Sequence, residues 1–176
     1  MPAPACRWTR RCGPEPLGLS PPQLRARALA CLAQREHSRH ELARKLLRAW
    51  QLAAAKAEEA LPDDAEAAVA ALLDQLADQG LLSEARYMDS RLRTRAPRLG
   101  ARRLAAELAQ QGLKPEGDTW AEVQATERER AQALLHRRFG ELPPPDPKER
   151  ARRVRFLVSR GFAADLAVRL VEGNRQ

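Results

Sequence analysis

The sequence predicts an all-α protein, built as an elongated array of three tandem three-helix repeats. Good helix formers (Ala, Leu, Arg and Glu) dominate, whereas strand formers are scarce, with one Tyr, three Phe and no Ile. Apolar residues make up 44% of the chain but aromatic residues only 4%. The core must therefore be built mostly from Ala, Leu and Val, as in packed helices. A helix-ending glycine motif that recurs three times supports repetition of one helical unit.

The first helix is predicted to begin at Ser20. Residues 1–19 are rich in Pro, Gly and Arg and lack periodicity, so we expect a disordered basic tail. Ser20 is followed by Pro21 at the first helical position and by Gln23 three residues later, which is a capping-box pattern. Four apolar residues then recur at helical spacing on one face: Leu24, Ala28, Cys31 and Leu32.

The stretch LAQREHSRHELARKL, residues 32–46, contains a helix end, a turn and a new helix start. Ser38 and Glu41 form a second capping-box pattern, in which the hydroxyl accepts from the Glu41 amide and the carboxylate reaches back to Ser38. The buried stripe of this helix is Leu42, Leu46, Ala49 and Trp50. Its basic residues lie on the other side: Arg44, Lys45 and Arg48. A third helix is expected from Pro62-Asp63-Asp64 through Leu76, with acidic residues at its positive end.

Turn and capping residues mark the remaining helices. Their predicted starts are Ser83, Gly100, Thr119 with Glu122, and Thr126 with Glu129. Pro97 ends the helix that follows Ser83. The last two helices are expected near 147–160 and 163–173, after the segment GELPPPDP. The predicted repeats span residues 20–80, 81–125 and 126–174.

The recurring glycine motif occurs as LADQGL (76–81), LAQQGL (108–113) and LVSRGF (157–162). Glycine after a helix adopts the left-handed conformation, and the next apolar residue folds back on the Leu one turn earlier. The expected pairs are Leu76 with Leu81, Leu108 with Leu113, and Leu157 with Phe162. Leu46, Leu108 and Leu157 are assigned to the core.

The sequence contains no pattern typical of an enzyme, a metal site or a cofactor site. His40 and Glu41 begin an HExxH-like pattern whose second His is missing, so we predict a capping turn with solvent-facing His37 and His40. No glycine-rich phosphate loop or nucleophile set can be singled out. Three Cys provide neither a disulfide framework nor a ligand quartet, which favours a reducing compartment. Since no signal peptide or membrane span is recognisable, we expect a cytoplasmic protein without membrane contact.

The net charge of +8 and the pI near 10.4 favour an anionic partner: nucleic acid, a nucleoprotein assembly or an acidic protein face. The alternative is a solvated, Arg-rich surface from a GC-rich genome, without a functional role. The candidate partner-binding residues are expected to point outward, opposite the apolar stripes. They are Arg44, Lys45, Arg48, Arg102, Arg103, Arg152 and Arg153.

Three ordered segments, within a match from about Arg25 to Glu172, resemble the bacterial RecX family, the modulators of the RecA recombinase. They are ALACLAQREHSRHELARKL (28–46), GLLSEARYMDSRLR (80–93) and RFLVSRGF (155–162). The chain departs from the family pattern in two places. Ser83-Glu84 stands where a more acidic turn is usual, and Tyr87-Met88 where Phe-Ala is usual.

The resemblance implies a curved array of three-helix repeats that lies along the groove of the RecA–DNA filament. There it would reduce ATP hydrolysis, strand exchange and co-protease activity, as a monomer and without a cofactor, and so limit homologous recombination and the SOS response. The alternative is a basic helical module that binds DNA independently of RecA. Binding to DNA through about six phosphates would weaken roughly a thousandfold between about 50 and 200 mM salt, and this separates the two hypotheses.

Overall fold

The computed structural model describes residues 19–144 and 146–173. Over these ranges the chain contains α-helices, one 3-10 turn and no strand, which confirms the all-α prediction. The elements are α1 (Pro21–Gln34), α2 (Arg39–Lys56), α3 (Ala65–Asp78), α4 (Glu84–Arg95), η1 (Ala96–Arg98), α5 (Ala101–Ala109), α6 (Asp118–Ala125), α7 (Glu127–Phe139), α8 (Pro147–Ser159) and α9 (Ala164–Glu172). The predicted tail, apart from its last residue, lies outside the described residues.

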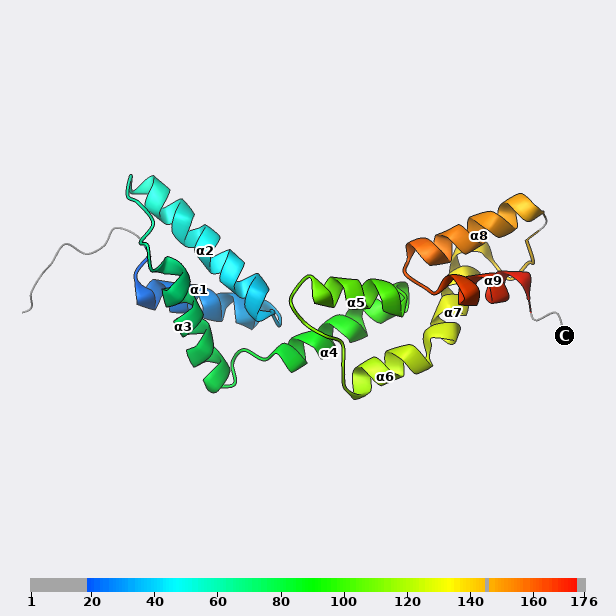
Figure 1. Ribbon diagram of the computed structural model, residues 1–176, viewed down its shortest axis with the longest axis horizontal. Coiled ribbons are helices and arrows are strands. Elements are labelled where there is room, and N and C mark those ends of the chain that lie inside the picture. The colour runs from blue at the N-terminus through cyan, green and yellow to red at the C-terminus, as the bar shows by residue number, and fades with distance from the viewer. Residues whose placement is uncertain (1–18, 145, 174–176) are drawn as a thin grey trace, which may run out of the picture.

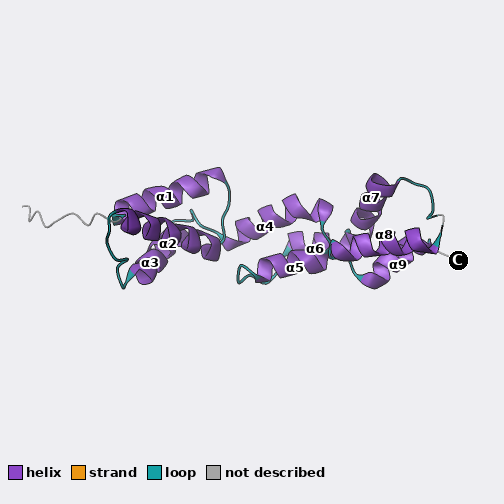
Figure 2. Cartoon of the chain, turned by 90° about the horizontal axis from the view of Figure 1, so that it is seen from above, coloured by secondary structure: helices purple, strands orange, loops and turns teal. Residues whose placement is uncertain are grey.

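The helices form three groups in a row along the longest axis, α1–α3, α4–α6 and α7–α9 (Figure 1 and Figure 2). Each group encloses its own hydrophobic cluster, and the described residues form three separate clusters rather than one continuous core. We refer to the groups as repeats 1, 2 and 3. The exact repeat boundaries stay a prediction, which these separate clusters support.

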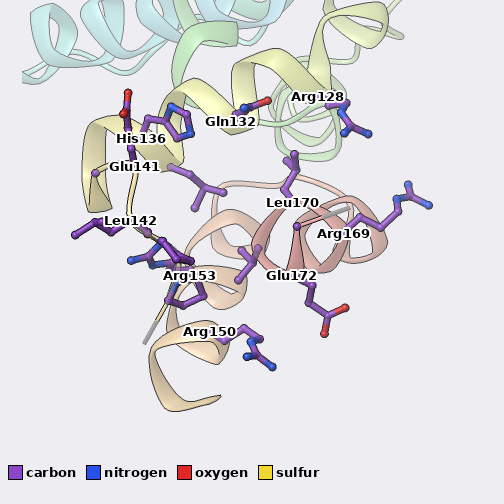
Figure 3. A pocket seen from close by; sticks show the side chains of 16 residues that line it. Arg128, Gln132, His136, Glu141, Leu142, Arg150, Arg153, Arg169, Leu170 and Glu172 are labelled. Carbon is purple, nitrogen blue, oxygen red and sulfur yellow. Dashed lines mark hydrogen bonds between the residues drawn. The ribbon is translucent and has the colours of Figure 1, made fainter. Parts of the chain in front are cut away.

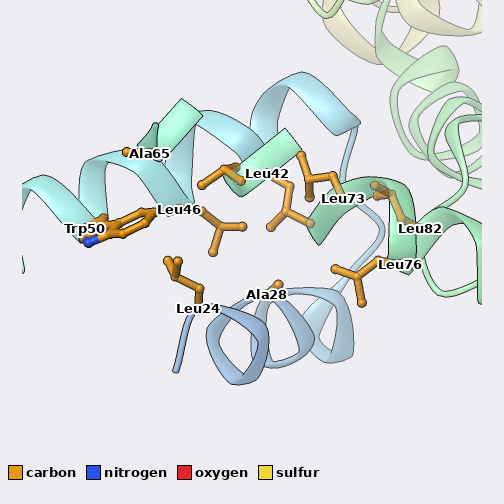
Figure 4. Packing of buried hydrophobic residues seen from close by; sticks show 10 residues of the cluster. Leu24, Ala28, Leu42, Leu46, Trp50, Ala65, Leu73, Leu76 and Leu82 are labelled. Carbon is orange, nitrogen blue, oxygen red and sulfur yellow. The ribbon is translucent and has the colours of Figure 1, made fainter. Parts of the chain in front are cut away.

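The cluster of repeat 1 is the largest of the three and joins the facing stripes of α1, α2 and α3 (Figure 4). Leu42 and Leu46 are fully buried on α2, as their spacing predicts. Leu19, the last residue of the predicted tail, packs against this cluster. Leu82, placed by sequence in the second repeat, is buried in the first. The clusters of the other repeats contain the two remaining predicted core leucines, Leu108 and Leu157.

Serine residues begin three of the helices in the predicted manner. The Ser20 amide donates to Gln23 Oε1 over 2.9 Å, which completes the first capping box. Ser38 Oγ accepts from the Glu41 amide at 3.0 Å, and Ser83 Oγ accepts from the Arg86 amide at 3.3 Å. Each bond satisfies one amide that the first turn leaves without an intrahelical partner.

Three predicted capping contacts are wrong. The Glu41 carboxylate does not return to Ser38 but pairs with the Arg35 guanidinium. Thr119 lies inside α6, which begins at Asp118 after Gly117. Thr126 separates α6 from α7 without a side-chain cap, because its hydroxyl donates to the Glu122 carbonyl at 2.8 Å. The predicted division of this segment into two helices is nevertheless confirmed.

All three glycine motifs form the predicted helix end. Gly80, Gly112 and Gly161 have φ of 68°, 75° and 88°. In each motif the amide after the glycine donates to the carbonyl of the Leu five residues earlier: Leu81 to Leu76 (2.9 Å), Leu113 to Leu108 (3.0 Å) and Phe162 to Leu157 (3.2 Å). One side-chain expectation is wrong, because Leu81 is exposed and its neighbour Leu82 is buried instead.

The junction between repeats 1 and 2 includes polar side-chain contacts. Ser38 Oγ donates to Gln111 Oε1 at 2.9 Å. Arg86 Nε donates to Glu36 Oε1 at 2.8 Å, with both side chains partly exposed. Pairs of this kind contribute little to stability in water.

Repeats 2 and 3 are joined through their backbones. The Gly100 amide donates to the Arg160 carbonyl at 3.0 Å, and the Arg102 amide to the Gly161 carbonyl at 3.2 Å. The Ala101 amide donates to Glu127 Oε1 at 2.8 Å. The start of α5 therefore lies directly against the turn between α8 and α9.

Candidate partner-binding surface

Arg44 and Arg48 are exposed on α2, one turn apart and opposite the buried stripe that contains Leu42 and Leu46. Among the described residues neither arginine forms an ion pair within the chain. Both guanidinium groups are therefore available to an anionic partner, in the position that the helical period predicts.

Lys45, the third predicted residue on this helix, is partly engaged within the chain. Its Nζ lies 2.9 Å from His37 Nε2 and 3.7 Å from Glu41 Oε1. The prediction of a solvent-facing His37 is wrong, since its exposed fraction is only 1%. His37 Nδ1 lies 2.9 Å from the Arg35 carbonyl oxygen. His40 is exposed, as predicted.

These contacts favour one protonation state of His37. A carbonyl can only accept, so Nδ1 carries the hydrogen, and Nε2 is then free to accept from the Lys45 ammonium. Burial lowers the pKa of His37, and the positive charges of Arg35 and Lys45 lower it further, against the opposing effects of the hydrogen bond to the Arg35 carbonyl and of Glu41. The buried ring is therefore held in its neutral form.

We expect the free energy of unfolding to decrease as the pH falls below about 6.5, the ordinary pKa of His. Because the pKa is lower in the folded state, the unfolded state binds more protons in this range, so acid favours unfolding. His37→Gln, whose amide oxygen can accept from Lys45, should remove most of this decrease. Urea unfolding followed between pH 7 and pH 5 measures it.

The control variant is His40→Gln, on the same turn but exposed, which should keep the wild-type pH dependence. The pKa of Glu41 is lowered: burial raises it, but the hydrogen bond and charge of Arg35 outweigh that effect. Its contribution is lost only at more acidic pH than the His37 window. A wild-type stability that does not change over this range would contradict the assignment of neutral His37.

Arg102 and Arg103 lie at the start of α5, at the junction with repeat 3. Both side chains are exposed, as predicted. Arg103 Nε is 3.7 Å from Glu107 Oε1, which also accepts from Arg95 Nη2 at 2.7 Å. Glu107 therefore partly neutralises Arg103, whereas Arg102 forms no ion pair among the described residues.

The two candidates on α8 differ in burial. Arg152 is 60% exposed, near Glu149 and the Phe139 ring. The outward position predicted for Arg153 is wrong, because its side chain is only 12% exposed. It donates to the Leu142 carbonyl at 2.8 Å and lies over the Phe139 ring. Arg153 thus holds the loop before α8 against the helix.

Sequence reasoning missed Arg130, which contacts more of the neighbouring repeat than any candidate. Its guanidinium donates to the carbonyls of Ala96, Leu99 and Val123 in repeat 2, at 2.5, 2.7 and 2.6 Å. Burial lowers the pKa of Arg130, but a guanidinium remains charged at neutral pH. The sequence does contain a pattern that indicates this position. Arg130 precedes the buried Leu134 by one helical turn, so both residues lie on the same face of α7.

Two cavities are lined by arginines. One, of about 320 Å³ in repeat 2, is bordered by Arg91, Arg95 and Arg103. The other, of about 370 Å³ in repeat 3, is bordered by Arg128, Arg150, Arg153 and Arg169. Within the described part of the chain, two side-chain atoms are buried without a hydrogen-bond partner, and both are arginine Nε atoms at these cavities, of Arg95 and Arg153.

The described residues form neither a metal-binding cluster nor a membrane-spanning helix. No group of three or more His, Cys, Asp or Glu side chains in these ranges could hold a metal ion. None of the described helices has the length and apolar character needed to cross a bilayer.

The fold and this surface define a class: a helical-repeat protein with basic side chains exposed on each repeat. Residues 126–171 match the family model described as RecX, third three-helix domain. The chain is 42% identical over 160 residues to the regulatory protein RecX of Ralstonia pickettii, covering 90% of this chain and 92% of the relative. It is 47% identical over 145 residues to that of Leptothrix cholodnii, covering 81% and 83%.

The identity to the regulatory protein RecX of Pseudomonas entomophila is 37% over 158 residues, with 88% and 93% covered. The chain belongs to the RecX family of regulatory proteins. The resemblance predicted from the three sequence segments is therefore confirmed, and the chain is a regulatory protein by family.

Proposed function

We propose that this protein binds the RecA–DNA filament and lowers its ATP hydrolysis, strand exchange and co-protease activity. One observation carries the proposal: three helical repeats stand in a row (Figure 1), and basic side chains are exposed on each of them. A filament presents the same charges at regular intervals along its axis. Linked weak contacts on successive subunits add to strong binding when the spacing of the repeats matches.

Exposure and intrachain pairing divide the proposed contact residues into two sets. Arg44, Arg48 and Arg102 are exposed, have no ion pair among the described residues, and form the main set. The secondary set has intrachain partners and contains Lys45, Arg103 and Arg152. Arg153 is assigned to the fold rather than to the partner. The proposal includes a monomer that acts without a cofactor and not as an enzyme, in the cytoplasm where the filament forms.

The first test is RecA ATP hydrolysis on single-stranded DNA while this protein is titrated in, with binding to bare DNA measured in parallel. We expect inhibition at concentrations well below those that saturate the DNA. The triple variant Arg44→Glu, Arg48→Glu, Arg102→Glu should need at least about tenfold more protein for the same inhibition. Each exposed pair contributes up to about 1 kcal/mol, and each reversal adds a repulsion.

The matched control reverses three exposed arginines outside the proposed set, one in each repeat: Arg27→Glu, Arg93→Glu and Arg155→Glu. It carries the same net charge as the test variant. Circular dichroism should show unchanged helical content in both. If the two variants inhibited RecA equally well, the proposed residues would have no special role in binding. If the wild type did not inhibit RecA at all, the proposed function would be rejected.

The second candidate function is DNA binding that is independent of RecA. It is favoured by the two arginine-lined cavities, because guanidinium groups match phosphate oxygens in geometry and charge. In that case inhibition would appear only when the DNA is coated, and it would disappear with rising salt together with DNA binding.

A further inference from the structure

The cavity of repeat 3 lies between three helices and the loop before α8 (Figure 3). Its labelled arginines come from all three helices: Arg128 from α7, Arg150 and Arg153 from α8, and Arg169 from α9. Two glutamates, Glu141 and Glu172, also line it. Four arginines against two glutamates give the lining a net positive charge.

Two of the four arginines have no partner within the described chain. Among the described residues, neither Arg128 nor Arg150 forms an ion pair or a side-chain hydrogen bond. Arg169 pairs with Asp165 at 2.7 Å, but both side chains are more than 60% exposed. An exposed pair of this kind contributes little, so Arg169 can exchange Asp165 for a stronger anion.

Arg153 forms the fixed wall of the cavity. Its contacts with the Leu142 carbonyl and the Phe139 ring hold the side chain in place. Its Nε is buried and lacks a hydrogen-bond acceptor, while the Glu149 carboxylate is 3.5 Å away with unsuitable geometry. An unsatisfied buried donor is costly, and native proteins keep few of them.

We propose that this cavity binds the phosphodiester backbone of DNA. The two free guanidinium groups lie at opposite ends of the cavity, that of Arg128 on α7 and that of Arg150 on α8 (Figure 3). They therefore suit two separate phosphates of one strand rather than a single small anion. Planar guanidinium groups bind phosphate oxygens in a bidentate manner.

The rim of the cavity fits the remainder of a nucleotide. Leu142 is 77% exposed and borders the cavity together with Pro143. An apolar rim beside a cationic floor matches deoxyribose beside phosphate. The inference rests on the second candidate function and deepens it, since it names the cavity and the DNA group that would be bound whether or not RecA is present.

The test compares two full-length double variants that lose the same charge from the same two helices. Arg128→Gln with Arg150→Gln removes the two free cavity arginines, whereas Arg138→Gln with Arg155→Gln removes two exposed arginines that do not line it. Binding to fluorescent oligo(dT) is measured by anisotropy between about 50 and 200 mM salt. Each lost phosphate contact lowers the slope of log K against log salt by about 0.7.

We expect the slope to fall by about 1.4 for the cavity pair and to change little for the control pair. Equal slopes in the two variants, or no binding of oligo(dT) by the wild type, would overturn the proposal. Binding of oligoglutamate is measured in the same way. If the cavity pair weakened binding to oligoglutamate but not to oligo(dT), the proposal would also be overturned, because the cavity would then bind an acidic protein segment. Inhibition of RecA ATP hydrolysis by the same variants is measured in a separate assay. A failure of the proposed function can therefore be distinguished from a failure of DNA binding at the cavity.

Discussion

Replacing Gly161 with alanine is expected to lower the free energy of unfolding by about 2 to 5 kcal/mol. Backbone strain and steric overlap both destabilise the alanine variant at this position. Gly161 has φ of 88°, which is strained for any residue with a Cβ. An added Cβ would also overlap the backbone and Cβ of Arg103 in the neighbouring repeat. Backbone cannot move aside as the end of a flexible side chain can, so the junction between repeats 2 and 3 must open.

Two further variants separate these costs. Gly112 ends α5 in the same motif with φ of 75°, but a Cβ there would meet nothing within 4 Å. Gly112→Ala should therefore cost only about 1 to 2 kcal/mol. Gly100 has φ of −78°, yet its Cβ would overlap the backbone of Gly161 and Phe162, so Gly100→Ala isolates the steric cost.

Urea unfolding of the three variants measures the differences. If Gly161→Ala were no more destabilised than Gly112→Ala, the close approach of repeats 2 and 3 would not persist in solution. A Gly100→Ala variant as stable as the wild type would lead to the same conclusion.

The helices and their ends could be predicted because they depend on local sequence. Ser20, Ser38 and Ser83 were recognised as caps, and Gly80, Gly112 and Gly161 as helix ends. The close approach of Gly161 to the neighbouring repeat could not be predicted from the sequence. It depends on Arg103, which is distant in the sequence, and no periodic pattern reports such a contact.

The candidate surface was predictable only as far as helical periodicity extends. Periodicity correctly placed Arg44 and Arg48 outside, because the opposite face of α2 carries the buried stripe. Periodicity failed for Arg153, whose guanidinium donates to the Leu142 carbonyl of the preceding loop. The capping turn predicted an exposed His37, but that ring is buried with Nδ1 against the Arg35 carbonyl. The cavity arginines on three different helices could not be assembled before the packing of repeat 3 was known.

Replacing Arg130 with methionine is expected to lower the free energy of unfolding by about 3 to 5 kcal/mol, because a half-buried guanidinium loses three hydrogen bonds to backbone carbonyls. Methionine keeps much of the aliphatic volume but donates no hydrogen bond. It would leave the carbonyls of Ala96, Leu99 and Val123 without their donor. These carbonyls lie in or just after the last turns of η1 and α6, where orphan acceptors and the negative end of the helix dipole favour a cation.

Arg130→Lys keeps the charge and tests the geometry. An ammonium is a compact point charge and cannot span three carbonyls as the planar guanidinium does, so only part of the stability should return. Urea unfolding gives the free energies, and the m-value shows whether the chain still unfolds as one unit.

Each repeat has its own hydrophobic cluster, so cooperativity between repeats depends on the contacts at their junctions. If Arg130 provides most of the coupling between repeats 2 and 3, Arg130→Met should broaden the transition or divide it into two steps. A single transition with unchanged midpoint would mean that the backbone bonds around Gly100 are sufficient to couple the repeats. The proposed contacts with successive filament subunits would require a fixed distance between the repeats. Arg130 joins the repeats at one junction, whereas the exposed Glu36–Arg86 pair at the other contributes little.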